Sequence, residues 1–160
     1  MLYLVGIGLK DEKDLTLRAL EVLKSCDIIY FEAYTSPLPS FDISNLAGLI
    51  DKPIHILQRK DLEEFSSEFL DKIKDKDAAI LIAGDPLIAT THHSLLIEAY
   101  EKGISVKVLH NASILSAAIS ESGLHVYKFG KIATIPSSSQ MDVVCRSLKQ
   151  NQRGNLHTLL

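Results

Sequence analysis

The sequence predicts an α/β fold: a three-layer α/β/α domain with an open, mainly parallel sheet. Three observations lead to this prediction. Short apolar runs alternate along the chain with segments of helical period. The helical segments are about 10 to 13 residues long, which is the length of crossover that parallel strands need. The run AAILIA at residues 78–83 is apolar on both faces, as is typical of a central parallel strand.

The first third of the chain contains three expected strands and one helix. The apolar run 2–6 ends in Gly-Ile-Gly, which predicts a buried strand followed by a tight turn. Residues 14–25 carry leucines at three-residue spacing among good helix formers, so we expect a helix. The β-branched and aromatic run 27–31 predicts a second strand, and the two prolines of 35–40 exclude a regular element there. A short third strand is expected at 53–57.

The middle of the chain repeats the alternation. Residues 62–74 have apolar side chains on one helical face, which predicts an amphipathic helix before the strand at 78–83. A second helical pattern covers 91–102, and Gly103 stands where a helix end favours the left-handed conformation. Another strand is expected at 105–110.

The last third continues with a small-residue helix at 111–122. Two short strands are expected at 125–129 and 131–135, and a final helix at 139–153. The apolar residues 156–160 have the pattern of a strand that is just beginning.

Composition limits the classes of function. A chain of 160 residues, 46% apolar and 23% charged, is long enough to form one packed domain without disulfides or metals. No apolar run approaches the roughly 20 residues of a membrane helix. Net charge is -3 and the basic residues are scattered, so we expect no direct nucleic-acid binding and no membrane association. Cys26 and Cys145 have no metal-site spacing; we expect two reduced thiols, and a disulfide stays open as the alternative.

Ligands of open parallel sheets bind beyond the carboxyl ends of the strands, where three turns of this sequence fall. In the first turn, Gly6 and Gly8 suggest a dinucleotide fingerprint, with Glu32 in place for a ribose hydroxyl. Asp11 occupies the third glycine position and would face the pyrophosphate. Two alternatives are a tight turn that needs positive φ, and a close backbone approach to a ligand without phosphates.

The second and third turns offer polar groups. Asp85, after Gly84, can accept hydrogen bonds from ribose hydroxyls or an amino group, or it can cap its own turn. His92 and His93 are adjacent and diverge on a helix, so we expect no metal site. Asn111 is a candidate helix N-cap, and the small residues after it leave room for a ligand or for close packing. The residues alone therefore indicate an α/β domain with a nucleotide-sized cleft.

At these turns the sequence resembles a known family. The segments MLYLVGIGL, IIYFEAYTS, AGDPLIATTHH, VLHNASI and GLHVYKFG resemble the diphthine synthases, which belong to the wider tetrapyrrole methylase class. The resemblance covers residues 1–160 and corresponds to the family's N-terminal domain. It implies a methyltransferase that uses S-adenosyl-L-methionine and methylates the amino nitrogen of the diphthamide precursor on a histidine of translation elongation factor two. It also implies a cytoplasmic homodimer.

The resemblance further implies five cofactor-binding residues: Leu9, Asp85, Ile88, Ser113 and Ile114. It names no catalytic acid or base and no metal ligand. The sequence departs from the family pattern at Lys10 and Ile88, where glycine is usual, and at the polar stretch Ser137–Gln140, where the family tends to be aromatic. These departures concern the shape of the cleft and the substrate contacts more than the class of cofactor.

The resemblance also predicts the domain organisation. We expect residues 1–136 to form a cofactor-binding α/β domain and residues 137–160 to form a helix and a linker or strand that lead to a second, absent domain. Two further hypotheses follow. The chain is a catalytically incomplete domain that folds or dimerises without methylating, or it is a nucleotide sensor that uses the glycine turn and Glu32.

Overall fold

In a computed structural model that describes residues 1–136 and 141–160, the chain forms two compact units, Met1–Ser113 and Ile114–Leu160. Residue 136, the predicted domain boundary, lies inside the second unit, and the domain organisation expected from the resemblance stays a prediction. The stretch Ser137–Gln140, where the sequence departs from the family pattern, lies outside the described residues.

The first unit confirms the predicted fold class. Its five strands are all parallel and lie in the order β3-β2-β4-β1-β5. All five residues of β4 are buried, because this central strand is covered on both faces. The strands are β1 (Leu2–Gly6), β2 (Ile28–Glu32), β3 (Ile54–Leu57), β4 (Ala78–Ile82) and β5 (Val106–Leu109).

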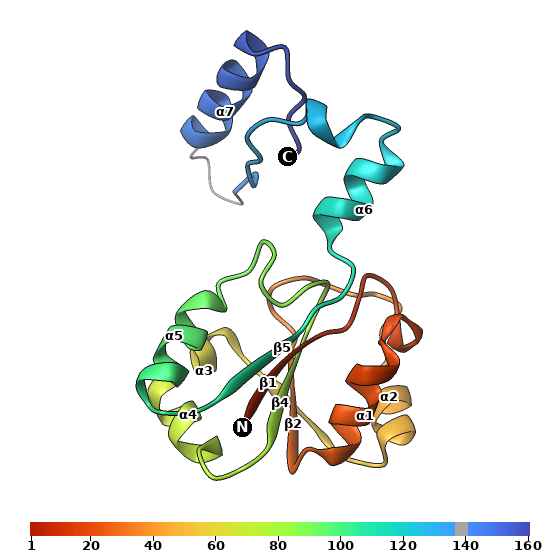
Figure 1. The fold of residues 1–160 in the computed structure, drawn as a ribbon, viewed down its shortest axis with the longest axis vertical. Helices are drawn as coiled ribbons and strands as arrows, with labels where there is room; N and C mark the ends of the chain where they lie inside the picture. Colours follow the sequence, from red (N-terminus) through yellow and green to blue (C-terminus); the bar gives the residue numbers. More distant parts are fainter. Residues whose placement is uncertain (137–140) are drawn as a thin grey trace. The chain divides into compact units, whose positions relative to one another are not determined.

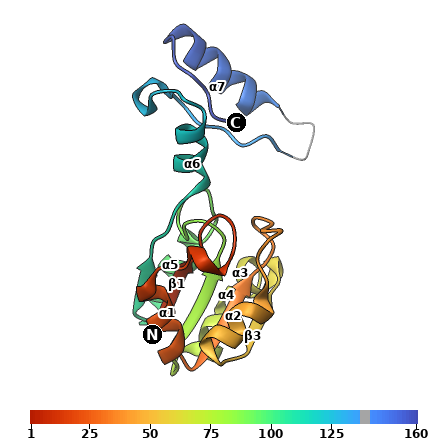
Figure 2. The same cartoon turned by 90° about the vertical axis from the view of Figure 1, so that its right-hand side faces the viewer.

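Helices cover both faces of this sheet (Figures 1 and 2). One face carries two helices, α1 (Leu17–Ser25) and α2 (Ile43–Ile50). The other face carries three helices, α3 (Arg59–Glu63), α4 (Ser66–Ile73) and α5 (His93–Glu101). The result is the three-layer arrangement that the alternating pattern predicts.

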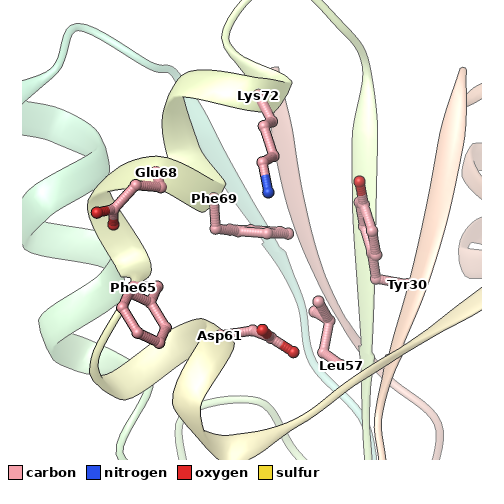
Figure 3. Close-up of a pocket in the computed structure, with 7 residues that line it drawn as sticks. All are labelled: Tyr30, Leu57, Asp61, Phe65, Glu68, Phe69 and Lys72. Atoms are coloured by element: carbon pink, nitrogen blue, oxygen red, sulfur yellow. The ribbon is translucent and has the colours of Figure 1, made fainter.

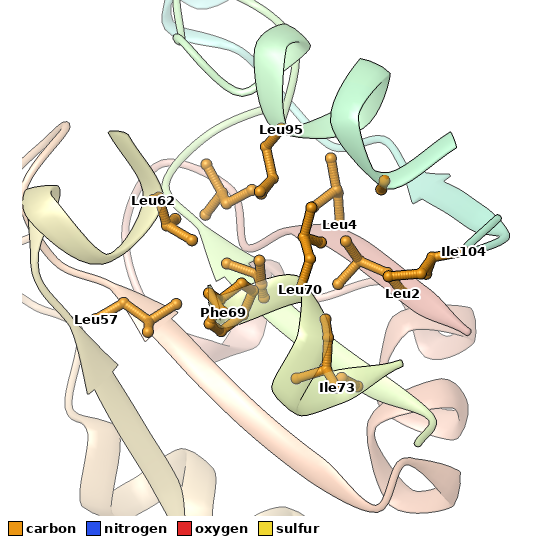
Figure 4. Close-up of a cluster of buried hydrophobic side chains, with 13 residues drawn as sticks. Leu2, Leu4, Leu57, Leu62, Phe69, Leu70, Ile73, Leu95 and Ile104 are labelled. Atoms are coloured by element: carbon orange, nitrogen blue, oxygen red, sulfur yellow. The ribbon is translucent and has the colours of Figure 1, made fainter. Parts of the chain in front are cut away.

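Alternate residues of each strand enter two separate cores. Leu4 and Ile80 point to the α3–α5 side, whereas Val5 and Leu81 point to the α1–α2 side. Figure 4 shows the first of these clusters, in which helix residues such as Leu70 pack on the sheet. Burial on both faces fixes the register of the central strands, because a shift by one residue would exchange the two cores.

Several elements differ from their predicted bounds. The first helix starts at Leu17 and not at Asp14, because the Thr16 side chain accepts a hydrogen bond from the Ala19 amide and caps it. Asp14 instead ends a short 3-10 helix, η1 (Glu12–Asp14). The single helix expected at 62–74 is two helices, α3 and α4. Helix α2 was not expected from the sequence.

The second unit contains α6 (Ile114–Glu121), the 3-10 helix η2 (Val126–Lys128) and α7 (Asp142–Arg153). The strands predicted at 125–129 and 131–135 are wrong: η2 occupies the first, and the second has no regular element. The buried Asn151 organises this unit, because its side chain bonds both the amide and the carbonyl of Lys131 and also Thr158 Oγ1.

Candidate functional site

The three turns singled out in the sequence follow β1, β4 and β5, which are neighbours in the sheet, so their carboxyl ends lie at one edge. The first two turns are joined by backbone hydrogen bonds. The Gly84 amide donates to the Gly8 carbonyl at 2.8 Å, and the Gly8 amide donates to the Gly84 carbonyl at 3.4 Å. We call the residues of these three turns the carboxyl edge: 6–9, 84–88 and 110–113.

Glycine is required at two positions of the first turn for different reasons. Gly8 has φ +79°, in the left-handed region that favours glycine. Gly6 has an ordinary φ, but a Cβ there would lie 2.6 Å from the Gly84 carbonyl oxygen and 2.9 Å from Asn111 Cβ. The tight-turn interpretation of Gly-x-Gly is therefore confirmed, with close packing between turns as a second cause.

The dinucleotide interpretation of this turn is wrong. The Asp14 carboxylate accepts hydrogen bonds from the amides of Leu9 at 3.0 Å and Lys10 at 2.9 Å, so these donors are engaged and face a negative charge instead of a pyrophosphate. Glu32 is fully buried, and its Oε1 accepts from the amides of Tyr34 and Thr35. It is not presented to a ribose hydroxyl.

Asp85 joins the second turn to the third. It is 5% exposed, and its Oδ1 accepts from the Leu87 amide at 3.0 Å. Its Oδ2 accepts from the Asn111 amide at 3.3 Å and lies 2.8 Å from Nδ1 of the exposed His110. The carboxylate thus performs the turn-capping role that the sequence left open. A direct contact between Asp85 and a cofactor stays a prediction.

Asn111 ties the third turn to the first. Its Nδ2 donates to the carbonyls of Gly6 and Asp14, each at 3.0 Å, and its Oδ1 accepts from the Ala112 amide. The N-cap prediction for Asn111 is wrong, because α6 begins only at Ile114. Sequence reasoning missed this bridging role, since the two carbonyls that accept from the Asn111 side chain lie about a hundred positions away in the chain.

Two of the predicted site residues, Leu9 and Ser113, lie beside Gly84. Gly84 has φ +68°, and a Cβ on it would lie 3.9 Å from Leu9 Cδ2 and 4.0 Å from Ser113 Cα. These are ordinary van der Waals contacts, so an added atom has room beside this backbone. Leu9, Asp85 and Ser113 are therefore brought together. Ile88 is 42% exposed on the loop after β4. Ile114 is exposed and is the first residue of the second unit.

Three pockets of the described residues are lined by none of the five predicted cofactor residues. A pocket of about 190 Å³ lies between α3–α4 and the strands β2 and β3, and none of the five predicted cofactor residues lines it (Figure 3). Residues 1–136 and 141–160 contain no cluster of three or more His, Cys, Asp or Glu placed to hold a metal ion. None of the helices in these ranges has the length and apolar character needed to span a bilayer. Both cysteines are free thiols.

The first unit is therefore an α/β domain with an open parallel sheet and glycine turns at its carboxyl edge, and proteins of this architecture bind their ligands beyond the carboxyl ends of the strands. Residues 1–156 match the family model described as Tetrapyrrole (Corrin/Porphyrin) Methylases, and the chain belongs to that family.

Named relatives make the comparison more specific. The chain is 42% identical over 139 residues to a diphthine synthase of Methanothermobacter thermautotrophicus, covering 87% of this chain and 52% of the relative. It is 39% identical over 160 residues to a diphthine synthase of Archaeoglobus fulgidus, covering 100% of this chain and 63% of the relative. A solved structure described as diphthine synthase superimposes with a TM-score of 0.91 at 38% identity, covering 98% of this chain and 62% of the other.

These comparisons confirm the resemblance predicted from the five sequence segments. They also show that the chain spans between about half and two thirds of the length of the relatives it matches.

Proposed function

We propose that this chain forms the cofactor-binding part of a methyltransferase of diphthamide biosynthesis that uses S-adenosyl-L-methionine. Its substrate is the diphthamide precursor on a histidine of translation elongation factor two. The observation that carries the proposal is the carboxyl edge, where Leu9, Asp85 and Ser113 converge around Gly84 in a chain whose relatives are named diphthine synthases.

The residues at this edge fit an uncharged nucleoside better than a phosphate. Leu9 and Ile88 offer apolar surface, and Gly84 lets a ligand approach the backbone. The carboxylates of Asp14 and Asp85 lie at the same edge and would repel phosphate groups. S-adenosyl-L-methionine carries no phosphate and has a positively charged sulfonium, so acidic groups near its site favour binding.

When bound, S-adenosyl-L-methionine would supply a methyl group carried on a sulfonium sulfur. As an amine nitrogen bonds to the methyl carbon, the carbon–sulfur bond would break and its electron pair would stay on sulfur. Such a displacement depends on alignment of the reactants more than on acid–base groups. The part proposed for this chain is therefore to bind and orient. Asp85 and Asn111 hold the three turns in a fixed arrangement, so the ligand meets a preformed surface.

The proposal extends to the assembly and location implied by the family resemblance, namely a cytoplasmic homodimer with elongation factor two as its protein substrate. The mixed surface charge, with net charge -3, is compatible with docking by shape on a protein. It gives no basic stripe for nucleic acid.

Calorimetric titration with S-adenosylhomocysteine tests the proposal. We expect saturable binding by the wild-type chain and a loss of at least tenfold in affinity in Asp85→Ala, because removal of the carboxylate takes the acceptor from the amides of Leu87 and Asn111 in the second and third turns. Asp75→Ala is the matched control: Asp75 is exposed in the turn before β4, at the opposite end of the sheet. It should bind as wild type does.

The other hypotheses predict different results. Binding without methyl transfer to elongation factor two would favour a catalytically incomplete domain. Binding of a nicotinamide dinucleotide that S-adenosylhomocysteine does not displace would contradict the exclusion of the nucleotide sensor, which rests on the engaged amides of the glycine turn and the burial of Glu32. No binding of S-adenosylhomocysteine by this chain or by a longer form of it would refute the proposed function.

A further inference from the structure

Four buried polar atoms near the carboxyl edge have no hydrogen-bond partner among the described residues: Glu32 Oε2, Tyr34 OH, His92 Nδ1 and His92 Nε2. The side chains of Glu32 and His92 are 0% and 1% exposed. Burial of such groups costs free energy unless they are paired, so their retention at one place calls for an explanation.

The two titratable side chains face each other across two loops. Glu32 ends β2, and its Oε1 is held by the amides of Tyr34 and Thr35 at 2.7 and 2.6 Å. Its other oxygen, Oε2, lies 3.6 Å from His92 Nε2. That separation is longer than a hydrogen bond but within Coulombic contact. His92 stands directly before α5, at the end of the segment that begins with Gly84.

The charges around His92 define its protonation state. Burial is the largest influence and lowers the pKa of His92; the carboxylate of Glu32, the Pro86 carbonyl and Glu63 oppose this, and His93 adds to it. The imidazole is therefore neutral at pH 7, with one N–H donor and one acceptor nitrogen. With its proton on Nε2, the neutral imidazole directs an N–H dipole at Glu32 Oε2 across 3.6 Å, which is a favourable electrostatic contact without a buried positive charge.

The loop after β2 and the loop after β4, which Glu32 and His92 bring together, both contact helix α3 as well. Thr91 Oγ1 donates to Glu63 Oε1 at 3.2 Å, and the Arg59 guanidinium lies 4.8 Å from the centre of the Tyr34 ring. Helix α3 thus touches the loop after β2 and the loop after β4. The pair of Glu32 and His92 is a buried contact between the ends of the β2 and β4 loops.

We propose that Glu32 and His92 form a buried positioning pair, in which His92, anchored on the Glu32 carboxylate, fixes the far end of the 84–92 segment whose near end carries Asp85. The inference deepens the proposed function and rests on it, because the segment so fixed is the one that would receive the cofactor. Both side chains are buried, so they act through the backbone of the loop and not by touching the ligand.

The test compares His92→Phe and Glu32→Gln with the wild-type chain. His93→Phe is the matched control, since it makes the same change at the exposed neighbouring residue. Amide hydrogen exchange over 84–92 and the affinity for S-adenosylhomocysteine are measured for each. We expect exchange to accelerate about tenfold and affinity to fall about tenfold in His92→Phe and Glu32→Gln, and neither to change in His93→Phe.

Two further readouts separate positioning from general destabilisation. The double variant Glu32→Gln/His92→Phe should lose no more affinity than the weaker-binding single variant, because one link is removed in each case. Imidazole ¹⁵N shifts of His92 in the wild-type chain should show one fixed neutral tautomer, and Glu32→Gln should abolish that preference. A packing role alone would lower the melting temperature and leave the tautomer unchanged.

The outcomes are distinct. Unchanged exchange over 84–92 in a folded His92→Phe variant overturns the positioning pair. If His92→Phe does not fold, unchanged exchange and an unchanged His92 tautomer in Glu32→Gln overturn it equally. If the wild-type chain fails to bind S-adenosylhomocysteine while exchange still rises in His92→Phe and not in His93→Phe, the loop-fixing role stands and the proposed function fails.

Discussion

Substitution of Gly6 by alanine is the sharpest test of how the carboxyl edge is assembled. The added Cβ would lie 2.6 Å from the Gly84 carbonyl oxygen, 2.9 Å from Asn111 Cβ and 3.0 Å from Pro86 Cδ. Cβ atoms do not approach a backbone oxygen at that distance, so the β4 turn must move. None of the three neighbours is the far end of a flexible side chain that could rotate away.

The loss of stability in Gly6→Ala can be estimated from the typical cost of inserting a methyl group into a packed core. Insertion of one methyl group into a well-packed site typically costs about 1 to 3 kcal/mol, and rigid backbone on one side places this site near the upper figure, about 3 kcal/mol. For a domain of this size, that corresponds to a fall of roughly 10 °C in the melting temperature. The same displacement of Gly84 should weaken binding of S-adenosylhomocysteine about tenfold.

Gly48→Ala is the matched control. Gly48 lies inside α2, and a Cβ there would meet no atom within 4 Å. Alanine is the better helix former, so this change should stabilise the chain by about 0.5 to 1 kcal/mol. Thermal unfolding followed by circular dichroism gives both values. A Gly6→Ala chain as stable as wild type, or a Gly48→Ala chain as damaged as Gly6→Ala, would refute the argument.

Three further predictions concern stability and reactivity. Asp14→Ala should cost about 1 to 2 kcal/mol in urea unfolding, because two backbone amides lose the carboxylate that accepts them; an unchanged midpoint would contradict this. Under native conditions a thiol reagent should label the exposed Cys145 and leave Cys26, which is buried and whose pKa burial raises to about 11; equal labelling rates would contradict it. Because the pKa of His92 is lowered in the folded state, the unfolded state binds its proton first, so the free energy of unfolding should decline as pH falls below about 6.5; this decline should be smaller in His92→Phe.

The parallel sheet could be predicted because its signals are local and strong. Each strand is a short apolar run, and β4 carries the two-sided burial that only a central strand has. The amphipathic pattern at 62–74 predicts one helix, whereas the structure has two, α3 and α4. Leu62 of α3 and Phe69 of α4 enter the same core, so the apolar period continues across the interruption between the two helices at Phe65.

Two misassignments have identifiable causes. Helix α2 follows a proline-rich loop and contains Gly48, which together hide its signals, although Asp42 caps it and Leu46 and Ile50 form a buried i, i+4 pair. The strands expected in the second unit do hydrogen-bond: the Gly130 amide donates to the His157 carbonyl. The pairing amounts to an isolated bridge, so apolar composition was mistaken for an extended ladder.

The candidate site could be predicted in place but not in detail. Strand ends and turn glycines located the carboxyl edge correctly, because topology alone brings parallel strand ends together. The hydrogen-bond partners of Asp85 and Asn111 could not be predicted, since they lie up to 105 positions away in the chain. The burial of Glu32 likewise depends on tertiary packing, and it removes the one acid that the dinucleotide interpretation required.

The most direct test of the central claim is to map where S-adenosylhomocysteine binds by following amide chemical shifts during a titration. The account predicts saturable shifts at the carboxyl edge, in residues 6–9, 84–88 and 110–113. It predicts none around the pocket between α3–α4 and β2–β3. Saturable shifts confined to that pocket, or elsewhere away from the three turns, would contradict the claim that these turns form the cofactor site.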